Sequence, residues 1–190
     1  RLHEIYVNLI KNSGCHLITG WGKVISPNLI SITKANNEII QATSKKIMIA
    51  VGGEASFPNF EGNQHLINSD KALDLSDLPN SIVIYGSGYI PVDSAGIFNG
   101  FGAHTHLVFR ADKVLRGFDD DIREHLMTSM EQKRITINKE VTISEIEKVN
   151  MNYSVILSNG KKLNVDKVMG ATGRIPKVSK LGLNDVGVDL

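Results

Sequence analysis

Residues 81–119 read SIVIYGSGYIPVDSAGIFNGFGAHTHLVFRADKVLRGFD, and this stretch decides the fold. The compact apolar run at 81–85 is typical of a buried strand, residues 88–101 have the length and pattern of a helix, and residues 104–109 form a second apolar run. A strand, a helix and a strand within about thirty residues match the size of a βαβ unit. The stretch therefore predicts two parallel strands joined by a crossover helix.

A glycine turn, Gly86-Ser87-Gly88, stands between the first strand and the helix. Glycines at this point let the backbone approach a pyrophosphate, which the positive N-terminus of the helix attracts. A third small residue usually permits close packing of helix and strand. This chain has Pro91 there, whose ring is expected to crowd that contact, although its missing N–H is tolerable in a first helical turn. Against the alternative of a plain glycine turn, we interpret the motif as the dinucleotide-binding turn of a Rossmann-like domain.

The residues after the second strand indicate which dinucleotide would bind. An NAD-dependent protein usually has a carboxylate about 20 residues after the glycines, where it binds the ribose 2′-hydroxyl. This chain instead has Phe109 and Arg110, and Arg116 follows six positions later. If the loop 111–115 folds back, both guanidinium groups reach the same ribose edge, where a 2′-phosphate would accept charge-assisted hydrogen bonds. The sequence therefore predicts NADPH in preference to NADH.

On the N-terminal side, residues 2–10 place apolar side chains at helical spacing, and residues 15–33 contain short apolar stretches broken by glycines and a proline, which favours a β-meander. The apolar run Lys46–Val51, followed by Gly52-Gly53, is expected to be a buried strand. Residues 54–80 have weak periodicity and are expected to connect two domains.

On the C-terminal side, residues 119–133 predict a second helix, whose three opening aspartates suit the positive end of its dipole. Its apolar positions Ile122, Leu126 and Met130 repeat every four residues. Short alternating strands are then expected at 135–137, 141–146, 153–157 and 162–163, with a hairpin turn at Asn159-Gly160. A buried run at 165–171 follows. The whole pattern predicts an α/β fold in which a parallel sheet is combined with helices and a β-meander.

The composition excludes several classes of function. The 190 residues are 42% apolar and 22% charged, as in ordinary globular proteins, and 21 basic residues face 20 acidic ones. No basic field is therefore expected to hold nucleic acid or an anionic membrane surface, and no apolar run approaches the roughly 18 residues of a membrane span. The single cysteine, Cys15, fits a reducing, cytoplasmic location. Because Arg1-Leu2-His3-Glu4 has neither an initiator methionine nor a signal-peptide pattern, we interpret the chain as an interior stretch.

Three further groups of residues are interpreted without a ligand. His104 and His106 face the same way on a strand, as metal ligands do, but no third ligand stands at a compatible spacing, so an ordinary strand face is favoured. The aspartates at 119–121 need no ion at the start of a helix. Cys15 lies between a helical and a strand pattern, where a small half-buried structural residue is expected. Its neighbour His16 would point to the opposite face of a strand and could not act as its base. No metal site is predicted.

Three stretches carry a resemblance to a known family, namely GSGYIPVDSAGI at 86–97, FRADKVLRGFD at 109–119 and ATGRIP at 171–176. They make the chain similar to the glutathione reductases, which are class I pyridine nucleotide-disulfide oxidoreductases, over essentially its whole length. The resemblance implies an NADPH-binding domain at 81–170. It also implies that 1–53 are the C-terminal part of an FAD-binding domain of the same Rossmann-like type, that 54–80 connect the two domains, and that 171–190 return into the FAD-binding domain.

The resemblance assigns roles to residues at the matching positions. Tyr89 would be a gate that covers the flavin until the nicotinamide displaces it, with a simply packed tyrosine as the alternative. Asp93 would be an acid on the flavin side. The remaining contacts to NADPH would come from Gly86, Ser87, Gly88, Ile90, Arg110, Arg116 and Gly173. The contacts to FAD would come from Gly22, Val51, Gly52 and Arg174.

The family pattern and this chain differ at three positions. The family generally has threonine at position 51, alanine or glycine at position 91, and glutamate at position 93. This chain has Val51, Pro91 and Asp93 at these positions. These differences keep a second class of function open, a nucleotide-binding module without redox activity.

The resemblance also implies what the complete protein does. Electrons would pass from NADPH through FAD and a redox dithiol to glutathione disulfide, in the service of thiol redox homeostasis. The family's dithiol and acid–base histidine have no counterpart in the chain, so no residue of these kinds is assigned. The expected partners are a small-molecule disulfide and a second subunit, bound through a C-terminal domain. Trypanothione reductase, which has the same arginine pair, and lipoamide dehydrogenase, which needs an acidic residue near 109, are the alternatives within the family.

Overall fold

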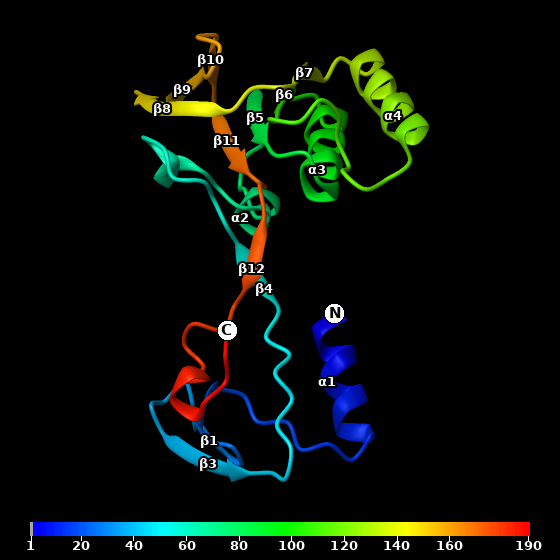
Figure 1. The fold of residues 1–190 in the computed structure, drawn as a ribbon. Helices are drawn as coiled ribbons and strands as arrows, with labels where there is room; N and C mark the ends of the chain where they lie inside the picture. The colour runs from blue at the N-terminus through cyan, green and yellow to red at the C-terminus, as the bar shows by residue number, and fades with distance from the viewer. Residues whose placement is uncertain (1) are drawn as a thin grey trace. The chain divides into compact units, whose positions relative to one another are not determined.

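The computed structural model describes residues 2–190, which divide into two compact units (Figure 1). Unit 1 comprises the residues up to Gly52 together with Pro176–Leu190, and unit 2 comprises Gly53–Ile175. The stretch 54–80, which the sequence suggests as a connection, lies within unit 2.

The centre of unit 2 is a four-stranded parallel sheet in the order β11-β5-β6-β7. The predicted βαβ unit is confirmed, because α3 joins two adjacent strands in which Ser81 pairs with His104 and Tyr85 with Val108. The bounds of these elements are β5 (Ser81–Tyr85), α3 (Tyr89–Gly100), β6 (His104–Val108), β7 (Thr136–Asn138) and β11 (Lys167–Gly170). The carboxyl ends of the parallel strands consequently meet at one edge, where ligands of open α/β sheets bind.

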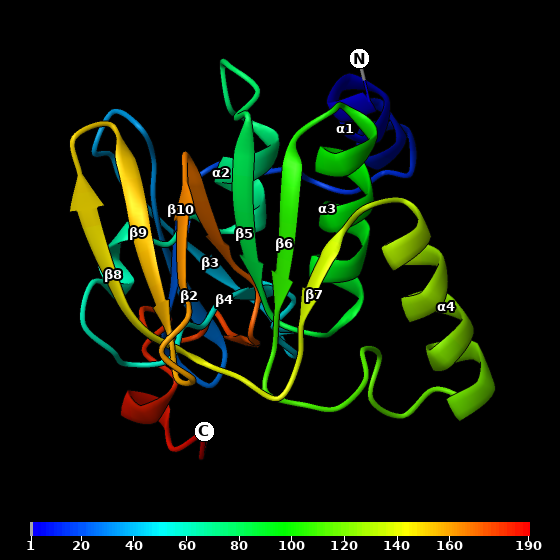
Figure 2. The same ribbon diagram turned by 90° about the horizontal axis from the view of Figure 1, so that it is seen from above.

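The parallel sheet lies between two different layers, because its side chains alternate between its faces. Ile82 and Ile84 belong to the core on the helical side, whereas Val83 and Tyr85 belong to the core on the other side. The second layer is an antiparallel meander in the order β10-β9-β8, formed by β8 (Ile143–Val149), β9 (Asn152–Leu157) and β10 (Lys162–Val165). Figure 2 shows the meander on one side of β5 and β6 and α3 on the other.

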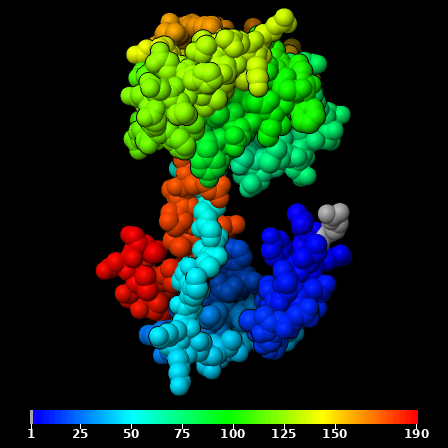
Figure 3. Space-filling view, turned by 90° about the vertical axis from the view of Figure 1, so that its right-hand side faces the viewer, coloured from blue at the N-terminus to red at the C-terminus, as the bar shows by residue number. Residues whose placement is uncertain are grey.

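The second predicted helix is confirmed as α4 (Asp120–Gln132), with Asp119 as its N-cap. Its predicted apolar stripe is buried only in part, because Met130 is 5% exposed whereas Ile122 is 58% exposed. The helix lies on the outside of unit 2, where Figure 3 shows it in yellow-green on the surface.

Residues 53–73 also contain regular structure. They form β4 (Gly53–Ala55), η1 (Asn63–His65) and α2 (Ser69–Leu73), and β4 pairs with β12 (Arg174–Pro176). Ile67 forms a parallel bridge with Met169 of β11, so this stretch extends the edge of the sheet. The weak periodicity of this stretch therefore reflects its very short elements.

Unit 1 contains the predicted N-terminal helix and the predicted meander. Its elements are α1 (Leu2–Asn12), β1 (Trp21–Ser26), β2 (Leu29–Thr33), β3 (Ile39–Thr43) and η2 (Asn184–Val186), and the strands pair antiparallel in the order β1-β2-β3. A small core of Val24, Leu181 and Leu183 joins the meander to the C-terminal residues. The backbone N–H of Val24 donates to the carbonyl oxygen of Leu181 at 2.8 Å.

The prediction of a buried strand at Lys46–Val51 is wrong. These residues form no strand, and the side chain of Met48 is 88% exposed. An apolar run becomes a strand only when another strand pairs with its backbone, and no residue in the described part of the chain does so here. Composition alone could not reveal that missing partner.

Taken together, the two units confirm the predicted fold class, an α/β fold in which a Rossmann-like parallel sheet is combined with helices and antiparallel meanders. Among residues 2–190, no helix has both the length and the apolar character needed to cross a membrane.

Candidate dinucleotide site

The first glycine of the turn is required by the backbone. Gly86 has φ 139°, and a Cβ at this position would collide with the carbonyl group of Ala171, 2.8 Å from its carbon. The turn is held in place because the N–H of Gly86 donates to Val108 at 2.9 Å and the N–H of Ala171 donates to Tyr85 at 2.8 Å. The turn thus passes close against Ala171, the residue that directly follows β11.

The second glycine of the turn leaves space for a ligand. Gly88 is the N-cap of α3, no side chain caps the helix there, and no atom lies within 4 Å of where a Cβ would stand. The amide groups of a first helical turn lack intrahelical acceptors and carry the positive end of the helix dipole. The start of α3 is therefore a site where a phosphate fits.

Pro91 lies directly against the first glycine of the turn. It is buried in the first turn of α3, and its Cγ atom lies 3.2 Å from the position of a Cβ on residue 86. The proline ring fills the space that a glycine without a side chain leaves open. The departure from the small-residue pattern is accommodated by Gly86 itself.

A cavity of about 770 Å³ opens at the carboxyl ends of β5, β6 and β11. It brings together most of the predicted nucleotide-binding residues from three separate parts of the sequence: Gly86, Ser87, Gly88, Tyr89, Arg110, Arg116 and Gly173. The cavity is also lined by residues that no sequence motif indicated, among them Ser56, Phe57, Pro58, Leu115, Phe118 and Thr172. The first three lie in the stretch expected to be a linker, where no local signal pointed to the site.

The electrostatic character of the cavity is basic. Arg110 and Arg116 both line it and are exposed, and none of the described residues that line it is acidic. Burial raises the pKa of the Tyr85 hydroxyl, while a backbone hydrogen bond from Ile143 and the nearby charge of Arg110 oppose that rise. The part of the cavity lined by these arginines therefore suits an anionic group rather than a hydroxyl that needs a carboxylate.

The loop 111–115 folds back, as the convergence of the two arginines requires. Leu115 adopts a left-handed backbone with φ 53°, and its N–H donates to the carbonyl oxygen of Ser87 at 2.7 Å. The N–H of Glu140 donates to Ala111 at 3.1 Å at the other end of the loop. The loop 111–115, which joins Arg110 to Arg116 and is called the arginine loop below, is thereby tied to the glycine turn.

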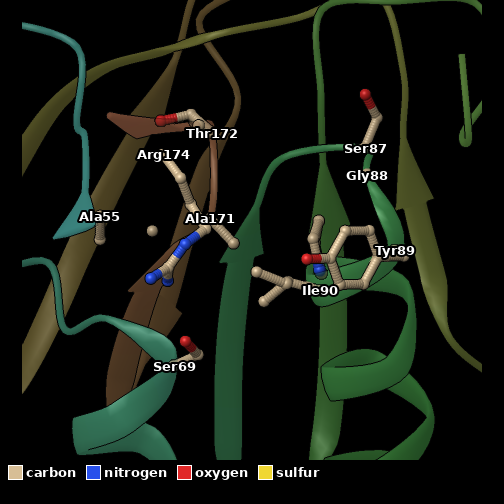
Figure 4. Close-up of a pocket in the computed structure, with 12 residues that line it drawn as sticks. Ala55, Ser69, Ser87, Gly88, Tyr89, Ile90, Ala171, Thr172 and Arg174 are labelled. Atoms are coloured by element: carbon tan, nitrogen blue, oxygen red, sulfur yellow. The ribbon is translucent and has the colours of Figure 1, made fainter. Parts of the chain in front are cut away.

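A second cavity of about 370 Å³ borders the first at the start of α3. Figure 4 shows Tyr89 and Ile90 on one side of it and Arg174 on the other. Tyr89 is 65% exposed, so it is not a packed core tyrosine. The guanidinium of Arg174 donates to the carbonyl oxygen of Gly53.

The predicted flavin-side residues are distributed over both units. Gly22 and Val51 line a separate, mostly apolar cavity of about 380 Å³ in unit 1, next to Trp21. Gly52 follows with φ 68° and does not line that cavity, whereas Arg174 belongs to unit 2. Asp93 is exposed on α3 and lines none of the three cavities.

The histidine pair lies on a strand face without a third ligand. The rings of His104 and His106 are 4.5 Å apart between centroids, and the Nδ1 atom of His106 is buried without a hydrogen-bond partner. Burial, together with the nearby charges of His104 and Lys161, lowers the pKa of His106 to about 4. Within residues 2–190, no group of three or more histidine, cysteine or acidic residues is arranged to hold a metal ion.

Cys15 is exposed, which corrects the expectation of a half-buried residue. It follows the end of α1 in a segment without regular structure, rather than beginning a strand. The apolar pattern placed the start of the meander at Cys15, which is six residues before β1 begins at Trp21.

Comparison with known sequences connects this geometry to a family. The model of the pyridine nucleotide-disulphide oxidoreductase family matches residues 1–190. The chain belongs to this family. It is 38% identical to a glutathione reductase of Burkholderia cepacia over 191 residues, which cover 100% of this chain and 41% of that protein. It is also 38% identical to a chloroplastic/mitochondrial glutathione reductase of Pisum sativum, covering 99% of this chain and 33% of the relative.

These relatives confirm the resemblance to the glutathione reductases, although the chain spans well under half of their length. The predicted cofactors, NADPH and FAD, agree with membership of this family.

Comparison with solved structures agrees on the fold. A Cu(II) complex of a cysteine-to-serine mutant of the HOCl-induced flavoprotein disulfide reductase RclA from Escherichia coli matches with a TM-score of 0.89 and 23% identity, covering 99% of this chain and 43% of that one. LpdA from Mycobacterium tuberculosis matches with a TM-score of 0.84 and 20% identity, covering 97% of this chain and 42% of that one.

Proposed function

We propose that the protein containing this chain is an NADPH-dependent, FAD-containing disulfide reductase that reduces glutathione disulfide. One observation carries the choice of nucleotide. Arg110 and Arg116 line the same cavity as the glycine turn, and none of the described residues that line this cavity is acidic. Two guanidinium groups favour a 2′-phosphate, and the absence of a carboxylate removes the usual partner of the NAD ribose.

The lining of the cavity supports an assignment of the residues that would hold NADPH. Gly86, Ser87 and Gly88 would lie along the pyrophosphate, and the open space at Gly88 supports this role. Arg110 and Arg116 would bind the 2′-phosphate. NADPH, when bound, supplies the hydride of the reaction.

The residues of the second cavity would bind the nicotinamide end of NADPH. Tyr89 would move aside to admit the nicotinamide, which its exposure permits, while Ile90 and Gly173 would line the pocket behind it. We assign residues 81–170 to NADPH binding, 54–80 to the connection, and 1–53 with 171–190 to FAD binding. Gly22, Val51, Gly52 and Arg174 would then contact FAD, and Asp93 would serve as the flavin-side acid.

The substrate assignment depends on the relatives. The curated relatives are named glutathione reductases, and the identity of 38% to two of them supports glutathione disulfide. Trypanothione reductase and lipoamide dehydrogenase types are the rivals within the family. The arginine pair argues against the lipoamide dehydrogenase type, because that type needs an acid where Phe109 and Arg110 stand.

The proposal is tested by nucleotide titration and by turnover. The complete protein should bind NADPH at least about 100-fold more tightly than NADH, because two charge-assisted contacts to the 2′-phosphate are lost with NADH. NADPH should bleach the flavin absorbance, and the NADPH oxidation that follows should be fastest with glutathione disulfide rather than trypanothione disulfide or lipoamide. Equal affinity for the two nucleotides would favour the lipoamide dehydrogenase type. Nucleotide binding without flavin reduction would favour a module without redox activity.

We further propose that the protein is a homodimer through a C-terminal domain and acts in the cytoplasm. Sedimentation equilibrium of the complete protein should give twice the mass of one chain. Cell fractionation should recover the protein with cytoplasmic markers, and recovery with an organelle, the location in the name of the Pisum sativum relative, would contradict the proposed compartment.

A further inference from the structure

An arginine outside the nucleotide cavity holds the loop that carries Arg116. Arg123 lies in the first turn of α4, and its side chain is only 13% exposed. It does not line the cavity. A guanidinium so well shielded from water requires several hydrogen-bond acceptors, and the loop 112–115 supplies most of them.

Three nitrogen atoms of this guanidinium have separate partners. The Nε–H donates to the carbonyl oxygen of Val114 at 2.7 Å, and Nη2 donates to the carbonyl oxygen of Lys113 at 3.3 Å. Nη1 donates to Oδ1 of Asp120 at 2.6 Å, and Nη2 lies 3.8 Å from Oδ1 of Asp112. The planar fork therefore binds two consecutive backbone carbonyls and is itself oriented by two carboxylates.

These contacts set the path of the loop. Val114 is fully buried, Leu115 has the left-handed backbone, and the N–H of Leu115 reaches Ser87. The carbonyls of Lys113 and Val114 thus point toward α4, while the N–H of Leu115 points toward the glycine turn. Arg116 follows directly and has no hydrogen bond of its own among the described residues. The backbone ahead of Arg116 is therefore what aims it at the cavity.

We propose that Arg123 is a positioning residue for NADPH selectivity, acting by holding the loop 112–115 so that Arg116 reaches the 2′-phosphate. This inference rests on the proposed function. Lysine cannot replace Arg123, because an ammonium group lacks the planar fork that binds two carbonyls and a carboxylate in fixed directions. Arg123→Lys leaves the overall charge of the region unchanged. Without the planar fork, however, the loop 112–115 is no longer held.

The test compares three variants of the complete protein by calorimetric titration with NADPH and NADH. Arg123→Lys keeps the charge, Arg123→Met removes it, and Lys113→Met is the matched control. Lys113 is a cation of the same loop, and within residues 2–190 its side chain pairs with two exposed carboxylates, those of Asp120 and Glu124. Both Arg123 variants should weaken NADPH binding about tenfold, because the phosphate contact of Arg116 becomes poorly aligned. Their NADH affinity should change less than about twofold, and Lys113→Met should leave both affinities within about twofold of the parent.

Titration with 2′,5′-ADP provides a second readout that does not depend on the flavin or on turnover. The Arg123 variants should lose affinity for it by the same factor as for NADPH. Circular dichroism and thermal unfolding would identify a variant that fails to fold, and the charge-conserving lysine variant then carries the test.

The outcomes separate the two proposals. If the parent protein does not prefer NADPH, the proposed function fails and this inference fails with it. If the parent prefers NADPH but Arg123→Lys keeps the same ratio of affinities, only the positioning role is overturned. Equal weakening toward NADPH and NADH would also overturn it, because that result indicates general loss of structure.

Discussion

The backbone N–H of Leu115 donates to the carbonyl oxygen of Ser87 at 2.7 Å, which links the arginine loop to the glycine turn across 28 residues of sequence. Ser87 belongs to the turn where a pyrophosphate fits, and Leu115 directly precedes Arg116 in the chain. The bond therefore couples the expected position of the pyrophosphate to the expected position of the 2′-phosphate.

Removal of both arginines should abolish the choice between nucleotides. In the double variant Arg110→Ala with Arg116→Ala, two charge-assisted hydrogen bonds worth about 1.5–3 kcal/mol each are lost from the NADPH complex. The affinity for NADH should stay nearly constant, because NADH has no group at that position. The ratio of the two dissociation constants measures the effect, and an unchanged ratio would remove the arginines from the nucleotide site.

The two glycines of the turn should respond differently to alanine. Gly86→Ala combines an unfavourable φ with a collision against the Ala171 carbonyl, so it should destabilise the protein by about 2–4 kcal/mol. Gly88→Ala has φ −78° and open space, so its melting temperature should remain close to that of the parent. The added methyl group should instead weaken nucleotide binding. Equal melting temperatures for the two variants would contradict this division of roles.

The stability of unit 2 should fall as the pH drops from about 6.5 to 4. His106 has a pKa of about 4 in the folded protein, whereas an unfolded histidine binds its proton near pH 6.5. The unfolded state therefore takes up the proton first, and the fold loses about 2 kcal/mol over this range after allowance for partial exposure. Below pH 4 both states are protonated and the loss levels off.

The variant His106→Phe tests this assignment, because it removes the titrating ring and keeps a similar volume on the strand face. Urea unfolding at pH 7 and pH 4.5 should show a smaller difference in this variant than in the parent. His125→Gln removes an exposed histidine of α4 and serves as the control for the substitution. A pH dependence that survives in His106→Phe would assign the effect to another group.

The N-cap of α4 should contribute measurably to stability. The Oδ1 atom of Asp119 accepts hydrogen bonds from the N–H groups of Asp121 at 3.0 Å and Ile122 at 3.4 Å. Asp119→Ala should therefore cost about 1 kcal/mol, the usual value for such a cap. Asp121→Ala removes a carboxylate from the same turn without removing a cap and should cost less. Equal losses would mean that the charge, rather than the cap, is what matters.

The elements that could be predicted from the sequence are those whose evidence lies within a few residues. The predictions were correct for the strand Ser81–Tyr85, the glycine turn and the helix that follows. A strand that is buried on both faces and a turn at the start of a helix both have strong local patterns. The run Lys46–Val51 has an equally apolar pattern but forms no strand, since strand formation depends on a partner that the pattern does not encode. Ser56, Phe57 and Pro58 reach the nucleotide cavity from a stretch whose sequence suggested only a linker.

The sequence by itself determined that a glycine turn opens a crossover helix and that two arginines stand where an acid would indicate NAD. These features depend on residue type and on spacing along the chain, which the sequence states directly. Only the tertiary structure decided that the loop 111–115 folds back onto Ser87, that Pro91 fits against Gly86, and that Arg123 binds the carbonyls of Lys113 and Val114. The reason is physical: backbone hydrogen-bond partners and close approaches between distant segments follow from packing in three dimensions, and residue spacing along the chain does not specify them.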